Sequence, residues 1–380
     1  MTSGAAVLPP FEAVYVDPSL AGSPVSERIR QGIGECSWQV CTDFDAVIHE
    51  KTSYEEDPCA AGKRILMIRP YPSQGRLVKA CPGTANHICC GYQIINVMTN
   101  CPMDCSYCIL QGYLNNPCVI VYPDFTRIFD EIEEVIAGQP SRVFRFGTGE
   151  LGDSLVLDDM IGFAAAAVPF FAARENAVLE LKTKSVNIEH LLSLDHHGKT
   201  VISWSLNTPR IIEEEEHGAA TLNERLAAAR RCAAAGYPVG FHFDPLILYP
   251  GWEADYQGVI DLLFAHIDPA RIRWISLGGL RFPPALKRVA QRRFPLTGIF
   301  TGELVPGADG KLRYLKPLRM ELYQKMVSWL RAYDERLFIY LCMERQDVWE
   351  RVFGSAPAGT GGLNRQFERH VSRCLREAAA

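Results

Sequence analysis

The sequence lacks any long hydrophobic run. A membrane-spanning helix needs roughly eighteen or more uninterrupted apolar residues. The most apolar stretch, residues 161–173, is shorter and is flanked by Asp158, Asp159 and Arg174. The N-terminal segment MTSGAAVLPPFEAVYVDP also lacks the basic start and apolar core of a secretory signal. These absences predict a protein without a membrane segment that works in the cytoplasm.

A positive net charge is lacking as well. The chain has 39 Lys and Arg against 44 Asp and Glu, a formal net charge of -5, so the chain as a whole carries no signature of nucleic-acid binding. The charge is unevenly distributed, because residues 281–331 contain eleven Lys or Arg and three acids. A run of this kind is typical of a solvated face.

Cysteine, in contrast, is abundant. The chain has thirteen, and seven of them fall within residues 81–118. Disulfides are the less expected explanation in a cytoplasmic chain. Isolated cysteines such as Cys232 and Cys374 are predicted to be small buried hydrophobes. The group within residues 81–118 therefore indicates a different role.

The pattern of the chain predicts three parts. Residues 1–88 are rich in Pro, Gly and Ser and are predicted to form an N-terminal accessory region with one strand at 64–68. Residues 89–353 alternate short apolar runs with helical stretches, which is typical of parallel βα units. Residues 354–380 are predicted to be a linker followed by a short polar helix.

Within the central part the pattern predicts six strands and five helices. The strands are expected at residues 92–98, 142–146, 178–182, 201–206, 238–243 and 272–277, and the helices at 126–137, 158–167, 187–194, 221–235 and 256–267. Thr221 with Glu224 three residues later forms the sequence signature of a capping box. Six such units predict a barrel-like or doubly wound parallel sheet. In both, functional side chains gather at the carboxyl ends of the strands.

Three cysteines follow the first predicted strand of this series. The segment TNCPMDCSYC places Cys101, Cys105 and Cys108 on one short loop, which lets three sulfurs face a common centre. A 4Fe–4S cluster takes four ligands. A loop with three thiolates therefore leaves one iron with an open coordination position, as in a catalytic metal site.

The alternative interpretation is a structural zinc site. It would use Cys105 and Cys108 together with Cys89 and Cys90 or with Cys118. Zinc sites usually combine two pairs with a two-residue spacing, and this chain has only one such pair. The position after the first strand of a βα series also favours the cluster.

The CxxxCxxC loop resembles that of the radical S-adenosylmethionine (SAM) superfamily, and later segments resemble the spore photoproduct lyase family within it. These segments are CSYCILQ, LKTKS, SWSLN, AGYPVGF, PGW and RF, between residues 105 and 282. The resemblance, which runs from about residue 92 to 325, implies a partial (β/α)6 TIM-like barrel. It also implies a 4Fe–4S cluster that cleaves SAM reductively to a 5′-deoxyadenosyl radical, which abstracts hydrogen from the substrate.

The resemblance implies roles for three further residues. Tyr107 resembles the aromatic residue that packs on SAM, Lys184 the lysine that holds the SAM carboxylate, and Ser205 a serine that binds SAM. An ammonium group is a suitable partner for a carboxylate. For Lys184 the alternative is an ordinary surface lysine.

Two positions depart from the family pattern. The family carries a cysteine after the second strand that returns a hydrogen atom to the product radical, and this chain has Glu150 there. After the last cluster cysteine, where the family often has tyrosine, the chain has Ile109. Gly149 and Glu150 instead resemble the Gly-Gly-Glu element that binds the SAM amino group. A simple strand-to-helix turn is the alternative.

Four residues are predicted to be catalytic: Glu150, His242, Asp244 and Cys90. His242 and Asp244 lie in a predicted strand that should be almost entirely apolar, although a satisfied core histidine is the usual explanation for one such residue. Cys90 precedes the first strand and is, with its neighbour Cys89, a candidate for the missing hydrogen donor. Two weaker candidates are Cys118 and Cys342.

Three functions remain open at this point. The first is radical chemistry on a nucleic acid photolesion. The second is the same chemistry on a different, non-DNA substrate, which the replacement by Glu150 favours. The third is a cluster- or zinc-binding protein without catalysis. The expected partners are SAM, an electron donor such as flavodoxin or ferredoxin, and DNA, with phosphate contacts from Arg281, Lys311, Arg313, Lys316 and Arg319.

Overall fold

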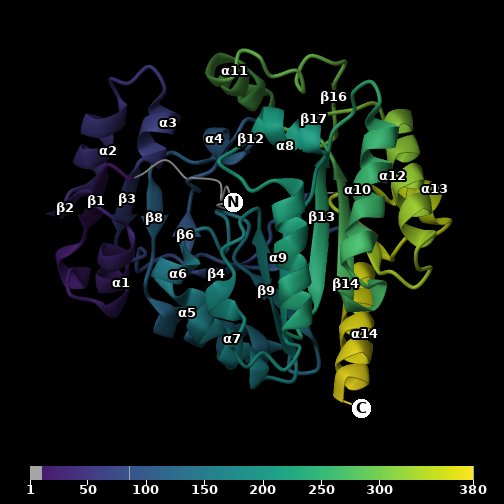
Figure 1. The fold of residues 1–380 in the computed structure, drawn as a ribbon, viewed down its shortest axis with the longest axis horizontal. Coiled ribbons are helices and arrows are strands. Elements are labelled where there is room, and N and C mark those ends of the chain that lie inside the picture. The colour runs from purple at the N-terminus through teal and green to yellow at the C-terminus, as the bar shows by residue number, and fades with distance from the viewer. Residues whose placement is uncertain (1–10, 85, 380) are drawn as a thin grey trace.

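Two sheets lie side by side in the computed structural model, which describes residues 11–84 and 86–379 (Figure 1). The first sheet has the strand order β2-β1-β3-β8-β6. Its strands are β1 (Ala13–Val16), β2 (Ser37–Val40), β3 (Ile65–Ile68), β6 (Met98–Thr99) and β8 (Val119–Val121). The helices α1 (Pro24–Gly32), α2 (Phe44–Thr52) and α3 (Pro58–Lys63) accompany it.

This first sheet is more regular than the sequence predicted for the N-terminal region. The expected strand at 64–68 is present as β3, but β1 pairs with it and β2 pairs with β1, both in a parallel arrangement. The four residues of β1 are all buried, and so short an apolar run gives too little periodicity to be recognised. The sheet also takes β6 and β8 from beyond residue 88, and one continuous core joins it to the second sheet.

The second sheet is a curled half-barrel, which confirms the predicted fold class. It has eight strands in the order β18-β14-β13-β11-β10-β9-β5-β4, with all neighbours parallel except β4 and β5. The strands are β4 (Val78–Ala80), β5 (Gln93–Ile95), β9 (Phe144–Gly147), β10 (Ala177–Thr183), β11 (Thr200–Ser205), β13 (Val239–Leu246), β14 (Ile272–Gly279) and β18 (Ile339–Leu341). Residues 81–84 and 86–92 leave its β4 edge and reach the chain just after β18, where the Ile88 amide donates to the Glu344 carbonyl at 2.8 Å.

Most of the expected helices connect these strands. They are α5 (Phe125–Gly138), α6 (Asp158–Ile161), α7 (Phe163–Ala172), α9 (Leu222–Ala234) and α10 (Trp252–His266). The capping box of Thr221 and Glu224 is confirmed. The expected helix at 187–194 is wrong, since only a short 3-10 turn, Glu189–Leu191, forms there. The Asn187 side chain donates to the Leu155 carbonyl at 3.0 Å, and such local bonds compete with a helix.

The C-terminal segment is a long helix, not a linker with a short one. The helix α14 (Gly359–Ala379) has 21 residues. Its buried side chains Leu363, Phe367 and Val371 recur every fourth residue, so one stripe of the helix joins the core. The Phe367 ring packs against Trp274 at 6.0 Å between ring centroids. The helix therefore covers the half-barrel near the amino end of β14.

A small lobe lies at the carboxyl ends of the barrel strands, at the top of Figure 1. It contains α11 (Pro284–Arg293) and the strands β15 (Arg281–Phe282), β16 (Val305–Pro306) and β17 (Leu312–Arg313). Its own apolar cluster includes Phe282, Leu286 and Phe300. The helices α12 (Lys316–Arg331) and α13 (Gln346–Phe353) follow. Among the described residues, no helix has the length and apolar character needed to span a membrane.

Candidate active site

The three predicted cluster ligands lie on the loop that follows β6. Cys101 and Cys105 are buried, Cys108 is half-buried, and all three are free thiols. The loop is held by β7 (Asp104–Cys105), which pairs antiparallel with β12 (Glu216–His217). The helix α4 (Leu110–Tyr113) begins directly after Cys108. The fold thus gives the three sulfurs a common, sheltered location beside the carboxyl ends of the barrel strands.

The chemistry of these thiols fits an iron–sulfur cluster. Burial raises the pKa of the Cys101 thiol to about 12 and also raises that of Cys105. Buried thiols of this kind become stable thiolates when a metal centre supplies positive charge. No group of three or more Cys, His, Asp or Glu side chains converges on a single ion position anywhere in residues 11–84 and 86–379. A cubane does not require such convergence, because each thiolate binds a different iron.

The first pair of additional ligands proposed for the zinc alternative lies apart from this loop. Cys89 and Cys90 line the barrel cavity described below, and no cluster cysteine is among its lining residues. Cys118 belongs to the same apolar core as Cys101, and together with Cys105 and Cys108 it would supply only three ligands. A structural zinc ion needs four ligands around one atom, so the geometry favours the cluster interpretation.

Tyr107 and Lys184 meet beside the cysteine loop. Lys184 follows β10, and its Nζ lies 5.7 Å from the centroid of the Tyr107 ring. The Tyr107 hydroxyl donates to Glu216, which also accepts from Arg225 Nη2 at 2.5 Å. Burial lowers the pKa of Lys184, but Glu216 and Cys105 outweigh it and raise the pKa above its ordinary value. Lys184 is therefore a half-buried ammonium group next to the cysteines, not an ordinary surface lysine.

The other predicted SAM contacts lie at neighbouring strand ends. A Cβ atom added at Gly149 would come within 2.6 Å of the Lys182 Cβ, so the close approach of the two chains requires glycine. Glu150 accepts a hydrogen bond from Lys182 Nζ at 3.2 Å. Ser205 is the last residue of β11 and is 8% exposed. The structure therefore brings these residues to the same edge of the sheet, and their contacts with SAM stay predictions.

A cavity of about 90 Å³ opens inside the half-barrel and brings the four predicted catalytic residues together. Glu150, His242, Asp244 and Cys90 all line it. The remaining lining residues are Cys81, Cys89, Tyr92, Arg145, Glu180, Lys182, Ser276, Arg281, Tyr340, Cys342 and Met343. Three of its four cysteines come from the segment that crosses from β4 to β18, which explains how residues near position 90 reach the barrel interior.

His242 belongs to a buried polar network below this cavity. Its Nε2 lies 2.8 Å from Oε1 of Glu180, which also accepts from Ser203 Oγ and Trp274 Nε1 at 2.7 Å each. Burial alone would raise the pKa of Glu180, but His242 and Arg145 hold it well below its usual range. His242 is therefore hydrogen-bonded within the core and also faces the cavity. Its position agrees with a satisfied core histidine, and the catalytic role stays a prediction.

Asp244 belongs to a second charged group. Arg281 donates to both carboxylate oxygens of Asp244 at 3.1 Å, and its Nη2 lies 3.3 Å from Cys342 Sγ. Burial would raise the pKa of Asp244, but Arg281 and Lys182 hold it below its usual value. The thiol of Cys342 is thus fixed between a carboxylate and a guanidinium group.

Three of the five basic residues expected to contact DNA pair with acids inside the protein. Arg281 pairs with Asp244 inside the barrel, Arg313 is 3% exposed and pairs with Asp309, and Arg319 is 4% exposed and bonds Glu344 at 2.9 Å. These arginines are neutralised by acids that are mostly distant in sequence, so the local excess of basic residues was misleading. Lys311 and Lys316 are not buried.

Arg145 and Lys182 line the cavity but are not among the site residues predicted from the sequence. Arg145 lies between Phe144 and Phe146 in β9, and its guanidinium group packs 5.0 Å from the Tyr92 ring centroid and 5.1 Å from that of Trp274. A charged residue within a buried strand was the available signal. Lys182 lies two residues after Glu180 on β10, so the alternation of side chains along a strand places both on the same face.

Comparison with known proteins assigns the barrel to a family. The family model described as spore photoproduct lyase matches residues 87–304. Curated spore photoproduct lyases of Geobacillus sp. (strain Y412MC61) and Bacillus subtilis (strain 168) are each 30% identical to the chain, over 206 and 203 residues. These alignments cover 53% and 52% of this chain, and they span 60% and 59% of the relatives' own length.

Solved structures show the same fold. A spore photoproduct lyase complexed with dinucleoside spore photoproduct matches with a TM-score of 0.76 and 24% identity. A mutant spore photoproduct lyase with bound AdoMet and dinucleoside spore photoproduct matches with the same values. In both cases the match covers 88% of this chain and 100% of the other chain. The fold of the chain thus agrees with that of these structures over nearly its whole length.

Proposed function

The chain belongs to the spore photoproduct lyase family, and on this premise we propose that it is a radical SAM enzyme that acts on a photolesion in nucleic acid. The observation that carries the proposal is the position of the cysteine loop. Cys101, Cys105 and Cys108 lie next to the half-buried Lys184 and Tyr107, at the carboxyl ends of strands that surround a polar cavity. Reactive centres of βα barrels occupy this end.

The residues around the loop are suited to hold the two cofactors. Cys101, Cys105 and Cys108 would bind a 4Fe–4S cluster, which when bound would supply the electron for cleavage of SAM to a 5′-deoxyadenosyl radical. Lys184 would donate to the SAM carboxylate, since its ammonium group is half-buried and its raised pKa keeps it charged. Tyr107 would pack on SAM, its ring fixed through the bond to Glu216. Glu150 would accept from the SAM amino group beside Gly149, and Ser205 would contact SAM from β11.

The cavity would receive the reacting part of the substrate. Related structures hold a dinucleoside spore photoproduct, and by analogy a lesion in DNA is the proposed substrate. A cavity of about 90 Å³ has room for only a small group, so the rest of a nucleic acid would lie outside it. Lys311 and Lys316 remain candidates for phosphate contacts. Flavodoxin or ferredoxin in the cytoplasm is the proposed electron donor.

A second candidate is the same radical chemistry on a different, non-DNA substrate. The observation that favours it is the ion pair between Glu150 and Lys182, 3.2 Å apart in the cavity. It occupies the place where the family carries a thiol, and a carboxylate does not donate a hydrogen atom readily. Under this proposal, His242 and Asp244 would contact the substrate from β13, and Cys90 or Cys342 would donate hydrogen if donation occurs.

Incubation of the reconstituted protein with SAM, dithionite and irradiated DNA tests the main proposal. The expected result is formation of 5′-deoxyadenosine together with loss of the spore photoproduct from the DNA. Formation of 5′-deoxyadenosine while the lesion persists would favour the second candidate. Absence of both products would favour a binding protein without catalysis.

Substitution of the cavity thiols tests the source of hydrogen. Cys90→Ala and Cys342→Ala should each be compared with Cys374→Ala, a half-buried cysteine on α14. A donor variant is expected to make 5′-deoxyadenosine at the wild-type rate but to give altered or trapped product. Normal turnover by all three variants would exclude both thiols as donors.

A further inference from the structure

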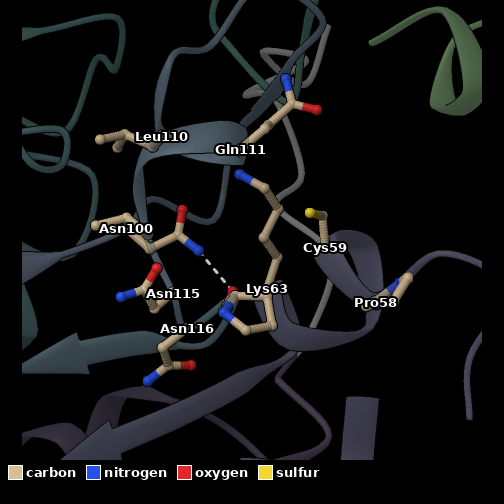
Figure 2. Close-up of a pocket in the computed structure, with 10 residues that line it drawn as sticks. Pro58, Cys59, Lys63, Asn100, Leu110, Gln111, Asn115 and Asn116 are labelled. Atoms are coloured by element: carbon tan, nitrogen blue, oxygen red, sulfur yellow. Dashed lines mark hydrogen bonds between the residues drawn. The ribbon is translucent and has the colours of Figure 1, made fainter. Parts of the chain in front are cut away.

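A lysine from the N-terminal sheet region reaches the backbone of the cysteine loop. Lys63 is the last residue of α3, and its side chain is 4% exposed. Its Nζ donates to the Cys101 carbonyl at 2.8 Å and to the Met103 carbonyl. Figure 2 shows the side chain extending from α3 toward Gln111 on α4. The ammonium group therefore binds the loop between the first two cysteines.

Asp104, also on the loop, lies between two cations. Its Oδ1 is 3.6 Å from Lys63 Nζ, and its Oδ2 accepts from Arg293 Nη2 at 2.8 Å. Arg293 comes from α11, is buried, and donates through Nε to both oxygens of Asp57 at 2.8 Å. Asp57 is the N-cap of α3. We call these four residues, Lys63, Asp104, Arg293 and Asp57, the loop clamp.

Two further contacts restrict the same loop. Gln111 Nε2 donates to the carbonyls of Cys105 and Ser106 at 3.1 and 3.0 Å, and its Oε1 accepts from Arg293. On α3, a Cβ atom at Gly62 would lie 2.5 Å from the Pro117 carbonyl carbon, so the helix sits directly against the chain that follows the loop. The clamp thus has little freedom to move relative to the cysteines.

A loop that binds a cluster must present three sulfurs in one fixed arrangement. Its carbonyls have few regular backbone partners, and buried carbonyls need donors. Outer groups that fix the orientation of metal ligands commonly determine the affinity of a metal site. The loop clamp provides such donors from the N-terminal region on one side and from the small lobe on the other.

We infer that the loop clamp holds the cysteine loop in its cluster-binding conformation, so that the N-terminal region is part of the cofactor site. The inference rests on the proposed cluster. Lys63 and Arg293 are positioning residues, because Lys63 bonds loop carbonyls and Arg293 bonds the Asp104 side chain. The N-terminal region would thereby help to hold the loop that binds the cluster.

The test compares Lys63→Met with Lys79→Met in the reconstituted full-length chain. Methionine keeps the length of the side chain but removes its charge and donors, and Lys79 is an exposed lysine that bonds only Tyr71 among the described residues. Lys63→Met is expected to lose iron to a chelator at least about tenfold faster than the control. Arg293→Met, which removes the other cation beside Asp104, should also lose iron faster than the control.

A second pair of measurements separates positioning from general stability. Metal-free Lys63→Met should still unfold cooperatively above the assay temperature, and Lys63→Arg should restore most of the iron retention. The pocket of about 130 Å³ beside Lys63 provides space for the larger side chain (Figure 2).

Iron loss at the wild-type rate in Lys63→Met would overturn the loop clamp alone. Unfolding of the metal-free variant below the assay temperature, without rescue by Lys63→Arg, would overturn it too. A wild-type protein that binds no iron would overturn the proposed function, and the clamp with it.

Discussion

The cysteine loop and the barrel cavity both contain buried charges, but the charges are used differently. At the loop, Lys63 donates to backbone carbonyls and Arg293 holds Asp104. In the cavity, side chains pair with one another, as in Glu180 with His242 and Asp244 with Arg281, and leave open space between the pairs. The loop is organised to fix a conformation, and the cavity is organised to present polar groups to a ligand.

Because the charges are used differently, substitutions in the two regions should have different effects. Damage at the loop should remove the cofactor and leave the fold, since the three thiols are not needed for the apolar core of the sheets. Damage to the cavity network should weaken the fold, because its charges are buried without solvent to replace a lost partner. The predictions that follow test this contrast, beginning with the largest effect.

Replacing Cys101, Cys105 or Cys108 by Ala should abolish iron binding and SAM cleavage completely, because a cluster held by two thiolates lacks a ligand. Iron and sulfide content and 5′-deoxyadenosine formation measure this loss. Cys232→Ala is the matched control, since Cys232 is a buried cysteine on α9. The circular dichroism spectrum should stay unchanged in all variants, and a parallel loss of secondary structure would contradict the contrast.

Glu180→Gln should lower the free energy of unfolding by about 3–5 kcal/mol, because it leaves His242 and Arg145 without the carboxylate that they share. Urea unfolding measures the change, with the exposed Glu175→Gln as control. The folded fraction should still bind iron as the wild type does. A loss below about 1 kcal/mol would mean that the network does not determine the stability of the barrel.

Lys184→Ala lies between the two regions and should weaken SAM binding by about 1.5–3 kcal/mol, the loss expected for a charge-assisted hydrogen bond. Iron content should remain that of the wild type. Titration with SAM, monitored by calorimetry, measures the affinity, and Lys199→Ala at the start of the β11 segment serves as control. Unchanged affinity in Lys184→Ala would show that the lysine does not hold the SAM carboxylate.

His370 on α14 is remote from both regions and should affect only the pH dependence of stability. Burial lowers the pKa of His370 to about 4, below its unfolded value of about 6.5. The folded state therefore disfavours protonation, so the stability contribution is complete above pH 6.5 and is lost as the pH falls toward 4.

The size of this contribution is about 1–3 kcal/mol. His370→Gln should remove that part of the pH dependence, whereas the exposed His49→Gln should not. Urea unfolding between pH 4 and 7 measures it. Identical pH profiles for His370→Gln and the wild type would contradict the assignment.

The fold of the barrel could be predicted because its signals are local. The strands β10, β11, β13 and β14 are apolar runs, and their observed bounds differ from the expected ones by at most a few residues. The sheet of β1, β2 and β3 was mostly missed, because its strands have four residues each. The helix α14 was taken for a linker because its first residues, Gly359 to Gly362, are poor helix formers.

The candidate site could also be predicted where its residues are close in sequence, but not where they are distant. The three cluster cysteines lie on one short loop, so their spacing alone identifies them. The cavity could be predicted only in part, since its walls combine residues as distant as Cys81 and Cys342. The ion pairs of Arg281 and Arg319 could not be predicted, because their partners, Asp244 and Glu344, are 37 and 25 residues away. Local charge patterns do not reveal such pairs.

Anaerobic reconstitution of the wild-type chain tests the central claim most directly. The account predicts about four irons and four sulfides per chain and formation of 5′-deoxyadenosine from SAM in the presence of dithionite. One zinc ion per chain without iron, or continued SAM cleavage by a variant with Ala at positions 101, 105 and 108 together, would contradict it.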